Sequence, residues 1–447
     1  MEDKALKVRN YILDRLEGGE LKPGQKLPGA REISGTLKIS FMKVQQALEQ
    51  LVRDGILEAV PRRGTFVQHE WQNRILQSNF TAFKTYFGLP WLSGLEKIFA
   101  EKLPQLRVRE KFRRSIFELR TTVTVQSESR DYLDLAPIFD KCYPDKSVFF
   151  THPFKTFYIN GRLPGIPFIF SPRVMFYNPE LLKKAGVSFP RPGWTWDDFL
   201  VIVRKLKKTL PSEKIFDWHS APSLWINIIF RAGACLMDPE REDMVMIDHP
   251  RTQYALELLS CLKKELNYDG NRPYPDYVRE FCKGELAFFI EPREIMPFIK
   301  RSKFKNWATV PIPFIEGGRD ISAQATDLIC IRNTCTDYQT AEEFVRLMLS
   351  EEVQDFIGAE AYGIPIRKSS AFKSIDIEDP RDALFLTEAS KTSAQYNIDS
   401  PELCAMINDG IRQILNNSEN IKKATRELAD AVRIFLNIKK HNNTEKL

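Results

Sequence analysis

The sequence of 447 residues predicts an α/β protein with a small helical module at its N-terminus and a much larger domain behind it. Two observations lead to this prediction. In the first seventy residues, three segments with helical apolar spacing precede two short β-forming runs. From residue 81 onward, strand-like and helix-like segments alternate, which is typical of a sheet covered by helices on both faces.

Helical periodicity is clear at the start of the chain. Apolar residues recur at three- and four-residue steps before a Gly-Gly pair that ends the first helix (Ala5, Val8, Ile12, Leu16, then Gly18). The segment 30–38, "AREISGTLK", predicts a short second helix. Ser40 is a suitable N-cap for the third, "FMKVQQALEQLVRD", and Gly55 a suitable stop.

The third helix and the hairpin after it carry side chains suited to DNA. Lys43, Gln45 and Gln46 are expected on its polar side, where glutamine can pair with adenine and lysine with guanine or phosphate. A merely solvated face explains the same residues. The tip "PRRG" presents Arg62 and Arg63, with Gly64 at the turn. Helix, short helix, capped helix and hairpin is the order of a winged helix-turn-helix, whose third helix enters the major groove.

The stretch from Tyr11 to Val67 resembles the GntR family of bacterial regulators, through "GELKPGQKLPGAREIS", "ISFMKVQQALEQLVRDGILE" and "RRGTFV". The resemblance implies that Arg31 contacts phosphate, that Ser40 opens the recognition helix and that Gly64 lies against DNA. Phe41, Lys43 and Gln45 depart from the family pattern, so Lys43 is expected to supply part of a phosphate interaction that Phe41 cannot make. The predicted DNA-binding residues are Arg31, Ser40, Lys43, Gln45, Gln46, Arg62, Arg63 and Gly64.

Beyond the module, residues 71–80 are predicted as a linker and 81–440 as an effector domain. The segment 81–88 is expected to form a strand and 93–104 a helix, with β-rich runs at 163–170 and 173–178. The best-marked helix is "GWTWDDFLVIVRKLKK". Thr195 caps it, Asp198 completes a capping box, and Trp194 and Trp196 are expected to pack structurally at its start.

This larger part resembles the periplasmic solute-binding proteins of ABC sugar importers, the maltose-binding class. Its marks include "INGRLPGIPFIF", "VMFYNPELLKKAGVSFPRPGWTWDDF", "FCKGELAFFIEP" and "YGIPIRKSSAF". The resemblance implies a type II periplasmic-binding-protein-like fold with two α/β lobes. Lobe one takes about 81–170 and 312–365, and lobe two about 171–311 and 366–440. A solute binds between the lobes, and its binding closes the hinge.

The same resemblance implies a set of ligand-binding residues, each of which also fits an ordinary structural role. The tryptophans fit the core equally well, and the carboxylates fit the surface. Aromatic faces suit the apolar face of a sugar, whereas carboxylates and arginine suit its hydroxyls, so a carbohydrate is favoured over other polar solutes. The predicted ligand residues are Trp91, Arg173, Trp225, Glu291, Asp327 and Tyr362.

Composition narrows the function further. Seven scattered cysteines and five histidines show no metal-ligand spacing, so reduced thiols and neither metal nor cofactor are expected. The first residues lack a signal-like apolar run and no long apolar stretch follows, so a cytoplasmic protein without membrane association is expected. We therefore predict a regulator, not an enzyme, that binds operator DNA and a small effector. A homodimer is expected because two half-sites multiply discrimination.

Three alternatives remain at this stage. One is a transport-linked solute receptor, which the DNA-binding module argues against. Another is an enzyme such as a glycoside hydrolase, for which "FDWHS" around His219 offers an acid beside an imidazole. A third is a GntR module joined to a Lac-repressor-type sensor. The marks "PRPGWTWDDF" and "YGIPIR" fit the maltose-binding class better.

Overall fold

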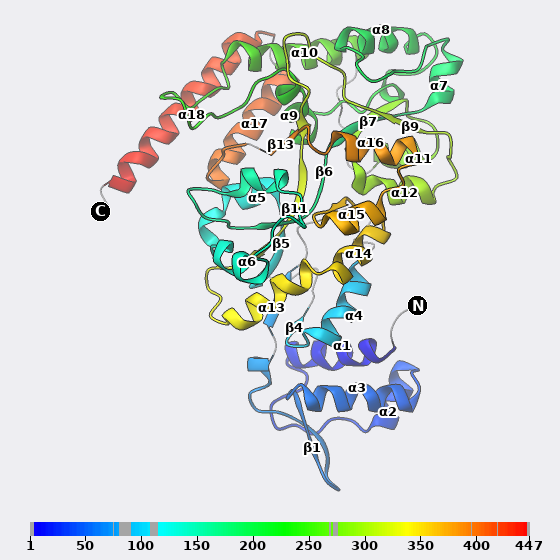
Figure 1. Cartoon of the computed structure of the whole chain (residues 1–447), viewed down its shortest axis with the longest axis vertical. Coiled ribbons are helices and arrows are strands. Elements are labelled where there is room, and N and C mark those ends of the chain that lie inside the picture. Colours follow the sequence, from blue (N-terminus) through cyan, green and yellow to red (C-terminus); the bar gives the residue numbers. More distant parts are fainter. Residues whose placement is uncertain are drawn as a thin grey trace. The chain divides into compact units, whose positions relative to one another are not determined.

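The computed structural model describes residues 4–74, 76–79, 91–107, 115–267, 270, 276–394, 396–417 and 419–444. Contacts divide the chain into two compact units (Figure 1). The first unit comprises Met1–Leu119 and Thr334–Leu347, and the second comprises Arg120–Asn333 and Met348–Leu447. The strand predicted over residues 81–88 lies outside the described residues.

The first unit begins with the predicted winged module. Its elements are α1 (Lys4–Glu17), α2 (Ala30–Leu37), α3 (Phe41–Arg53), β1 (Leu57–Val60) and β2 (Gly64–Val67). The two strands form an antiparallel hairpin that projects from the three helices (Figure 1). The helices pack around a common apolar core that includes the predicted Val8 and Ile12 of α1 together with Val44 and Leu48 of α3. The predicted elements of this module are confirmed.

The ends of α3 match the prediction in position and differ from it in one hydrogen bond. Ser40 occupies the N-cap position, and its backbone carbonyl accepts hydrogen bonds from the Lys43 and Val44 amides. The Ser40 side chain makes no capping hydrogen bond, so that part of the expectation is wrong. Gly55 follows the C-cap with φ +70°, a conformation in which glycine is favoured, and the predicted stop is confirmed.

The rest of the first unit follows the hairpin. It contains the 3-10 helix η1 (Trp71–Arg74), β3 (Leu76–Asn79), α4 (Leu92–Lys102), β4 (Leu106–Arg107), the start of β5 (Phe117–Thr121) and most of α13 (Tyr338–Met348). Strand β3 pairs in parallel with β4 and β5. The segment 71–80, predicted as a linker, therefore contains regular structure, and Trp71 is buried in the core of the winged module.

The second unit holds two larger sets of paired strands. Strand β6 (Ile166–Ser171) is antiparallel to β11 (Ala325–Ile331) and β12 (Ile364–Pro365). Strand β7 (Arg173–Tyr177) is antiparallel to β8 (Phe288–Pro292) and β9 (Ala308–Val310). Only Pro172 separates β6 from β7, so the chain passes directly from one sheet to the other. A short parallel pair, β10 (Ser322–Ala323) with β13 (Thr392–Ser393), adds a third connection between distant segments.

Helices surround these sheets. They are α5 (Thr122–Ser127), α6 (Ala136–Cys142), α7 (Pro179–Lys184), α8 (Trp196–Leu206), α9 (Pro222–Arg231), α10 (Pro250–Leu266), α11 (Asp276–Cys282), α12 (Met296–Arg301), α14 (Glu351–Ala359), α15 (Lys368–Ser374), α16 (Pro380–Glu388), α17 (Pro401–Asn417) and α18 (Ile421–Thr444). Short 3-10 turns lie at η2 (Ser129–Asp131), η3 (His152–Phe157), η4 (Ser212–Lys214) and η5 (Arg293–Ile295). No helix within the described part of the chain is long and apolar enough to cross a membrane.

Helix α8 confirms the capping box predicted from the sequence. The Thr195 hydroxyl accepts a hydrogen bond from the Asp198 amide, and the Asp198 carboxylate accepts one from the Thr195 amide. Trp194 and Trp196 are both buried, and the Trp194 indole donates to the carbonyl of Pro311 over 2.8 Å. Their predicted structural role is confirmed. All seven cysteines are unpaired thiols, as expected.

One ion pair in the first unit is almost sealed from water. The Arg9 guanidinium of α1 lies 3.7 Å from the Asp54 carboxylate at the end of α3, and each side chain is only 7% exposed. Arg9 also donates to the Pro104 carbonyl over 2.6 Å. Burial lowers the pKa of Arg9 and raises the pKa of Asp54, so each charge depends on its partner.

Replacing Asp54 with alanine should therefore destabilise the winged module. The Arg9 guanidinium would stay buried without its carboxylate, which we expect to cost about 3 kcal/mol. Urea denaturation followed by hydrogen exchange of the α1 and α3 amides measures this loss. Glu20→Ala is the matched control, because it removes the exposed Arg15–Glu20 pair and should cost well under about 1 kcal/mol. Equal losses in the two variants would contradict the assigned role of Asp54.

Candidate functional site

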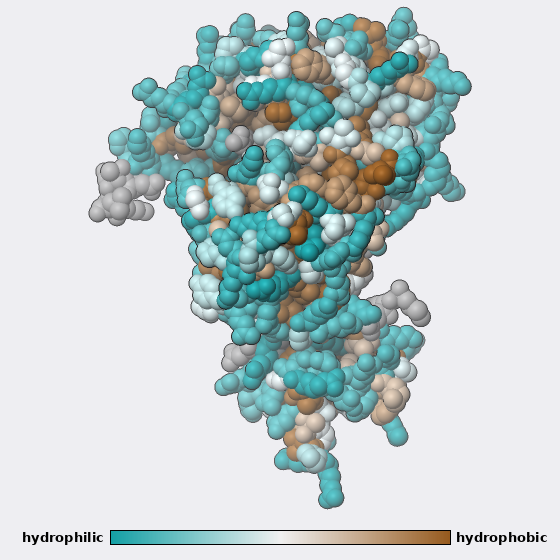
Figure 2. Space-filling model, in the orientation of Figure 1, coloured by the Kyte–Doolittle hydropathy of each residue, from teal (hydrophilic) through white to brown (hydrophobic). Residues whose placement is uncertain are grey.

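The predicted DNA-binding side chains lie in the winged module, most of them in contact with solvent. Arg31 is in the first turn of α2, and Lys43 is in the first turn of α3. Arg62 and Arg63 lie at the tip of the β1–β2 hairpin, which is hydrophilic in Figure 2. Of the eight predicted residues, Gln45 is half-buried and the other seven are exposed.

The backbone of the hairpin tip is tightly specified. Arg62 has φ +61° and Gly64 has φ +114°, and the Arg63 amide closes the turn by donating to the Val60 carbonyl over 3.0 Å. A Cβ atom on Gly64 would lie 2.8 Å from Cε of Lys26. Glycine at this position therefore lets Lys26 lie behind the tip. The sequence did not reveal this third cation, because Lys26 lies in the turn-rich connector before α2.

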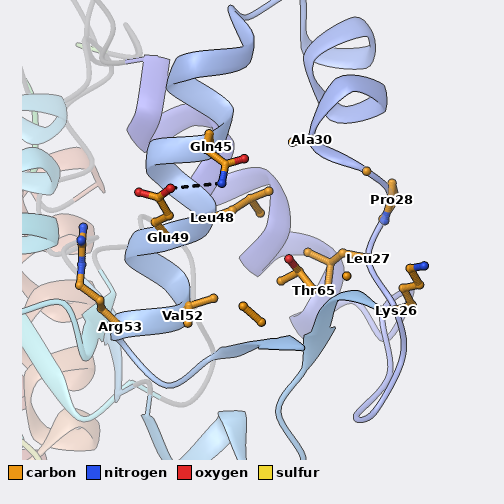
Figure 3. A pocket seen from close by; sticks show the side chains of 13 residues that line it. Lys26, Leu27, Pro28, Ala30, Gln45, Leu48, Glu49, Val52, Arg53 and Thr65 are labelled. Atoms are coloured by element: carbon orange, nitrogen blue, oxygen red, sulfur yellow. Dashed lines mark hydrogen bonds between the residues drawn. The ribbon is translucent and has the colours of Figure 1, made fainter. Parts of the chain in front are cut away.

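A groove of about 680 Å³ separates α3 from the segment that precedes α2 and from the hairpin (Figure 3). Gln45, Glu49 and Arg53 line it from α3, while Lys26 and Thr65 lie on the opposite wall. The Gln45 amide donates to the Glu49 carboxylate over 3.1 Å (Figure 3). Gln45 would have to exchange this hydrogen bond for one to a base.

Gln46 does not share that groove with Gln45. It lines a separate hollow together with Leu6 and Arg9 of α1 and Lys97 of α4. Its side-chain carbonyl accepts a hydrogen bond from Lys43 over 3.0 Å. Successive residues on a helix point about 100° apart, so the two glutamines serve different surfaces. The structure therefore separates two residues that sequence reasoning placed on one polar face.

The second unit brings together three of the six predicted ligand residues. Arg173 begins β7, and its guanidinium lies 3.5 Å from the carboxylate of Glu291 on the paired strand β8. Asp327 lies on β11 and is 3% exposed. Burial and the charge of Glu294 raise the pKa of Asp327 well above its usual range, which connects it to the same group of charges.

The other three predicted ligand residues are all buried. Trp91 precedes α4 in the first compact unit and is fully buried. Trp225 lies inside α9, three residues after its start, and is fully buried with no hydrogen-bond partner for its indole nitrogen. Tyr362 precedes β12 and is 1% exposed. Burial on this scale fits the core role considered for the tryptophans.

Further side chains join Arg173 that the sequence did not nominate as ligand residues. The Tyr277 hydroxyl donates to the Glu291 carboxylate, and the His219 ring stacks on Tyr277 with centroids 6.4 Å apart. Nε2 of His219 lies 3.7 Å from the Asp217 carboxylate. Electrostatic coupling to Arg173 adds Glu294 and Tyr396. We call this set the Arg173 cluster: Arg173, Asp217, His219, Tyr277, Glu291, Glu294, Asp327 and Tyr396.

Burial dominates the electrostatics of the Arg173 cluster. It raises the pKa of Glu294 to about 7 and also raises that of Glu291, despite the nearby Arg173 guanidinium. Burial together with Arg173 lowers the pKa of His219 to about 4, so its imidazole is neutral at physiological pH. One carboxyl oxygen of Glu294 and one of Asp327 have no hydrogen-bond partner. Buried polar atoms without partners make the cluster a candidate ligand site.

A neighbouring arginine is, by contrast, fully compensated. Arg293 makes two hydrogen bonds to Asp382, of 2.7 and 3.0 Å, and also donates to the carbonyls of Gly363 and Ser374. Its backbone amide donates to the Ser171 hydroxyl over 2.9 Å. These bonds tie the end of β8 to β6, β12 and α16. Arg293 is therefore part of the scaffold behind the cluster, and its charge also lowers the pKa of Glu294.

Known families account for both parts of the chain. Residues 4–67 match the family described as bacterial regulatory proteins, gntR family. Residues 121–382, more than half of the chain, match the family described as bacterial extracellular solute-binding protein. The chain belongs to the bacterial extracellular solute-binding protein family and carries a GntR-type winged helix-turn-helix domain at its N-terminus.

Similar curated proteins match only a short part of the chain. The HTH-type transcriptional repressor NagR of Bacillus subtilis is 37% identical over 70 residues, 16% of this chain and 29% of that protein. The mannosyl-D-glycerate transport/metabolism system repressor MngR of Escherichia coli is 38% identical over 66 residues, 15% and 28% of the two chains. The chain thus spans less than a third of either relative. Regulators and solute-binding proteins, not enzymes, are the kinds of protein that match.

Solved structures show the fold of the larger part. Maltose-bound MalE3 of T. maritima has a TM-score of 0.66 at 17% identity, covering 81% of this chain and 99% of that one. The GacH receptor of Streptomyces glaucescens has a TM-score of 0.68 at 17% identity, covering 81% and 98%. The predicted combination of a winged helix-turn-helix and a two-lobed binding-protein fold is confirmed.

The raised pKa of Glu294 predicts a specific loss of stability at alkaline pH. The folded protein holds this proton up to about pH 7, whereas an unfolded glutamate loses it near its ordinary value of 4.5. The free energy of unfolding should therefore fall as pH rises from 6 to 8, and Glu294→Gln should remove about 1 kcal/mol of that fall. Urea denaturation at the two pH values measures it.

The comparison between variants removes the background that both proteins share. The lowered pKa of His219 contributes a slope of opposite sign, and the raised pKa of Glu291 a slope of the same sign. The difference between the variants includes Asp327, whose pKa is raised partly by the charge of Glu294. Glu285→Gln changes an exposed glutamate of the same unit and should follow the wild type. Identical slopes for wild type and Glu294→Gln would show that Glu294 is ionised throughout.

Proposed function

We propose that the protein is a ligand-responsive transcriptional regulator. Its winged module binds operator DNA, and its two-lobed domain binds a small solute, a sugar or an oligosaccharide. The observation that carries the proposal is the presence, in one chain, of a GntR-type domain and a solute-binding fold with a buried, incompletely paired polar cluster. Several relatives of the module are named as repressors of sugar-related systems, including MngR and an arabinose metabolism repressor.

Exposed cations support the DNA-binding role. Arg31, Lys43 and the two arginines at the hairpin tip are exposed, and Lys26 lies behind that tip. In a winged helix-turn-helix, the third helix enters the major groove and the hairpin reaches adjacent phosphates or the minor groove. Lys43 and Gln45 then lie near base edges, with the hairpin cations on the backbone. Gln46, which lines a different hollow, is the weakest member of the proposed set.

The Arg173 cluster supports the solute-binding role. Arg173 and Glu291 come from the paired strands β7 and β8, whereas Asp327 comes from β11 of the other sheet. A solute that contacts all three would bind to both sheets at once, which is how closure around a ligand is achieved. The titles of similar structures name maltose, acarbose and cycloalternan as bound molecules, which supports a carbohydrate.

The proposed regulation depends on thermodynamic linkage between solute binding and DNA binding. A solute changes DNA affinity only as far as it prefers one arrangement of the protein over another. A homodimer in the cytoplasm fits this role, because two winged modules on adjacent half-sites respond together to a change in spacing. Trp225 and Tyr362, which are buried in the same unit as the Arg173 cluster, would then support the binding site from within the core.

Removing both cations from the hairpin tip should weaken DNA binding generally. Arg62→Ala with Arg63→Ala should lower affinity for all duplex sequences and reduce the slope of log K against log salt by about two, because about two phosphates are no longer neutralised. Fluorescence anisotropy with labelled duplex DNA at several salt concentrations measures both effects. Arg204→Ala with Lys207→Ala removes the same charge from the second unit and is the matched control. An unchanged salt slope in the hairpin variant would refute the wing assignment.

A further inference from the structure

The Arg173 cluster contains more acid than base. Four carboxyl groups belong to it, and Arg173 is its one guanidinium (Asp217, Glu291, Glu294 and Asp327). All four acidic side chains are at least nine-tenths buried. His219 adds no charge near neutral pH, because burial and Arg173 lower its pKa to about 4. Arg173 can balance one carboxylate, and it lies against Glu291.

The surrounding scaffold compensates the cluster only in part, because the charge of Arg293 lowers the pKa of Glu294 while burial still raises it to about 7. Arg293 follows β8 directly, and its guanidinium makes two hydrogen bonds to Asp382. Lys300 lies 3.7 Å from that same Asp382. Both cations therefore contact a carboxylate outside the cluster, and neither makes a hydrogen bond to the unpartnered oxygens of Glu294 and Asp327. Within the described residues, no group of three or more acidic, histidine or cysteine side chains could hold a metal ion.

Two acids of the cluster each have one oxygen without a hydrogen-bond partner. These oxygens belong to Glu294, which is 8% exposed, and to Asp327, which is 3% exposed. An ionised carboxylate without a partner is costly inside a protein, and the group takes up a proton instead. The raised pKa values of both acids express this cost. The cluster therefore favours a group that brings positive charge to these two oxygens.

We infer that the solute bound by the Arg173 cluster carries a protonated amine, as an amino sugar with a free amine does, and that Glu294 and Asp327 bind that nitrogen. The inference rests on the proposed function, in which this cluster is the solute site. An ammonium group donates to both unpartnered oxygens and also offsets their charge. A neutral hydroxyl can donate a hydrogen bond but leaves the excess of acid in place. The aromatic rings of Tyr277 and Tyr396 are also suited to a cation.

The charge of the ligand determines how its binding affinity changes with pH. Burial raises the pKa of Glu294 to about 7 and also raises that of Asp327, and an ammonium ligand requires both groups ionised. Binding must then release protons, so affinity for an amine should increase as pH rises from 6 to 8. His219 stays neutral throughout this range, and Arg173 stays charged. A neutral sugar that uses the protonated acids as donors should instead bind more weakly at pH 8.

Matched ligand pairs test the inference on the full-length protein. The panel holds the glucosamine dimer with free amines beside its N-acetylated counterpart, spermidine beside N-acetylated spermidine, and maltose and maltotriose as neutral sugars. Thermal shift at pH 6 and 8 screens the panel, and isothermal titration in two buffers of different ionisation enthalpy counts protons. We expect a free amine to stabilise the protein more than its acetylated counterpart, and to release protons on binding.

Isosteric variants assign the amine site to the two acids. Glu294→Gln and Asp327→Asn should each weaken binding of the amine about thirty-fold, because a buried charge partner is removed, and should reduce the pH dependence. Glu285→Gln should bind as the wild type does. Melting without ligand verifies that each variant is folded, and either variant alone suffices for the comparison.

The possible outcomes separate the inference from the proposed function. Stabilisation by maltose or by an acetylated sugar, with no response to amines, overturns the inference and leaves a sugar-binding regulator. Amine binding that survives both isosteric changes overturns the assignment of Glu294 and Asp327. No stabilisation by any amine or sugar in the panel counts against both the inference and the proposed solute.

Discussion

Four buried carboxyl groups around a single available guanidinium are the constraint on which the second unit depends. The packing of β7 against β8 brings Glu291 to Arg173, and the turn η5 after β8 adds Glu294. Ionised carboxylates are costly in buried surroundings. These carboxyl groups therefore take up protons unless a cation is bound beside them. An arrangement of this kind is common at functional sites, where local stability is lower than elsewhere in the fold.

The winged module is stabilised in a different way. Its three helices and hairpin enclose their own apolar core, and its buried ion pair between Arg9 and Asp54 joins the first helix to the end of the third. Arg9 also reaches the Pro104 carbonyl, beyond the module in the same unit. A rigid module with cations at its projecting tip is suited to hold DNA through phosphates, while sequence is read by the exposed part of α3.

Local signals explain how much of the fold could be predicted from the sequence. Gly55, the hairpin tip and the Thr195–Asp198 capping box act within a few residues, so the elements they delimit were predicted correctly. The Arg173 cluster depends on interactions between residues far apart in the sequence, of which Arg173 and Tyr396 are the most distant, 223 positions apart. Resemblance supplied Arg173, Glu291 and Asp327 as candidates, whereas Tyr277 of α11 and Glu294 of η5 join them only through tertiary packing and burial. Glu294 had a weak signal, three residues after Glu291 at the end of a strand.

The central claim is that solute binding and DNA binding are coupled within one chain. Thermodynamic linkage requires that the coupling be reciprocal: a solute that changes DNA affinity by some factor must have its own affinity changed by DNA by the same factor. Titrating duplex DNA with and without a bound solute, and that solute with and without DNA, measures both factors on the same protein. The account predicts two equal factors that differ clearly from one. Two factors of one, with both ligands bound, would show a chain whose two parts act independently and would contradict the account.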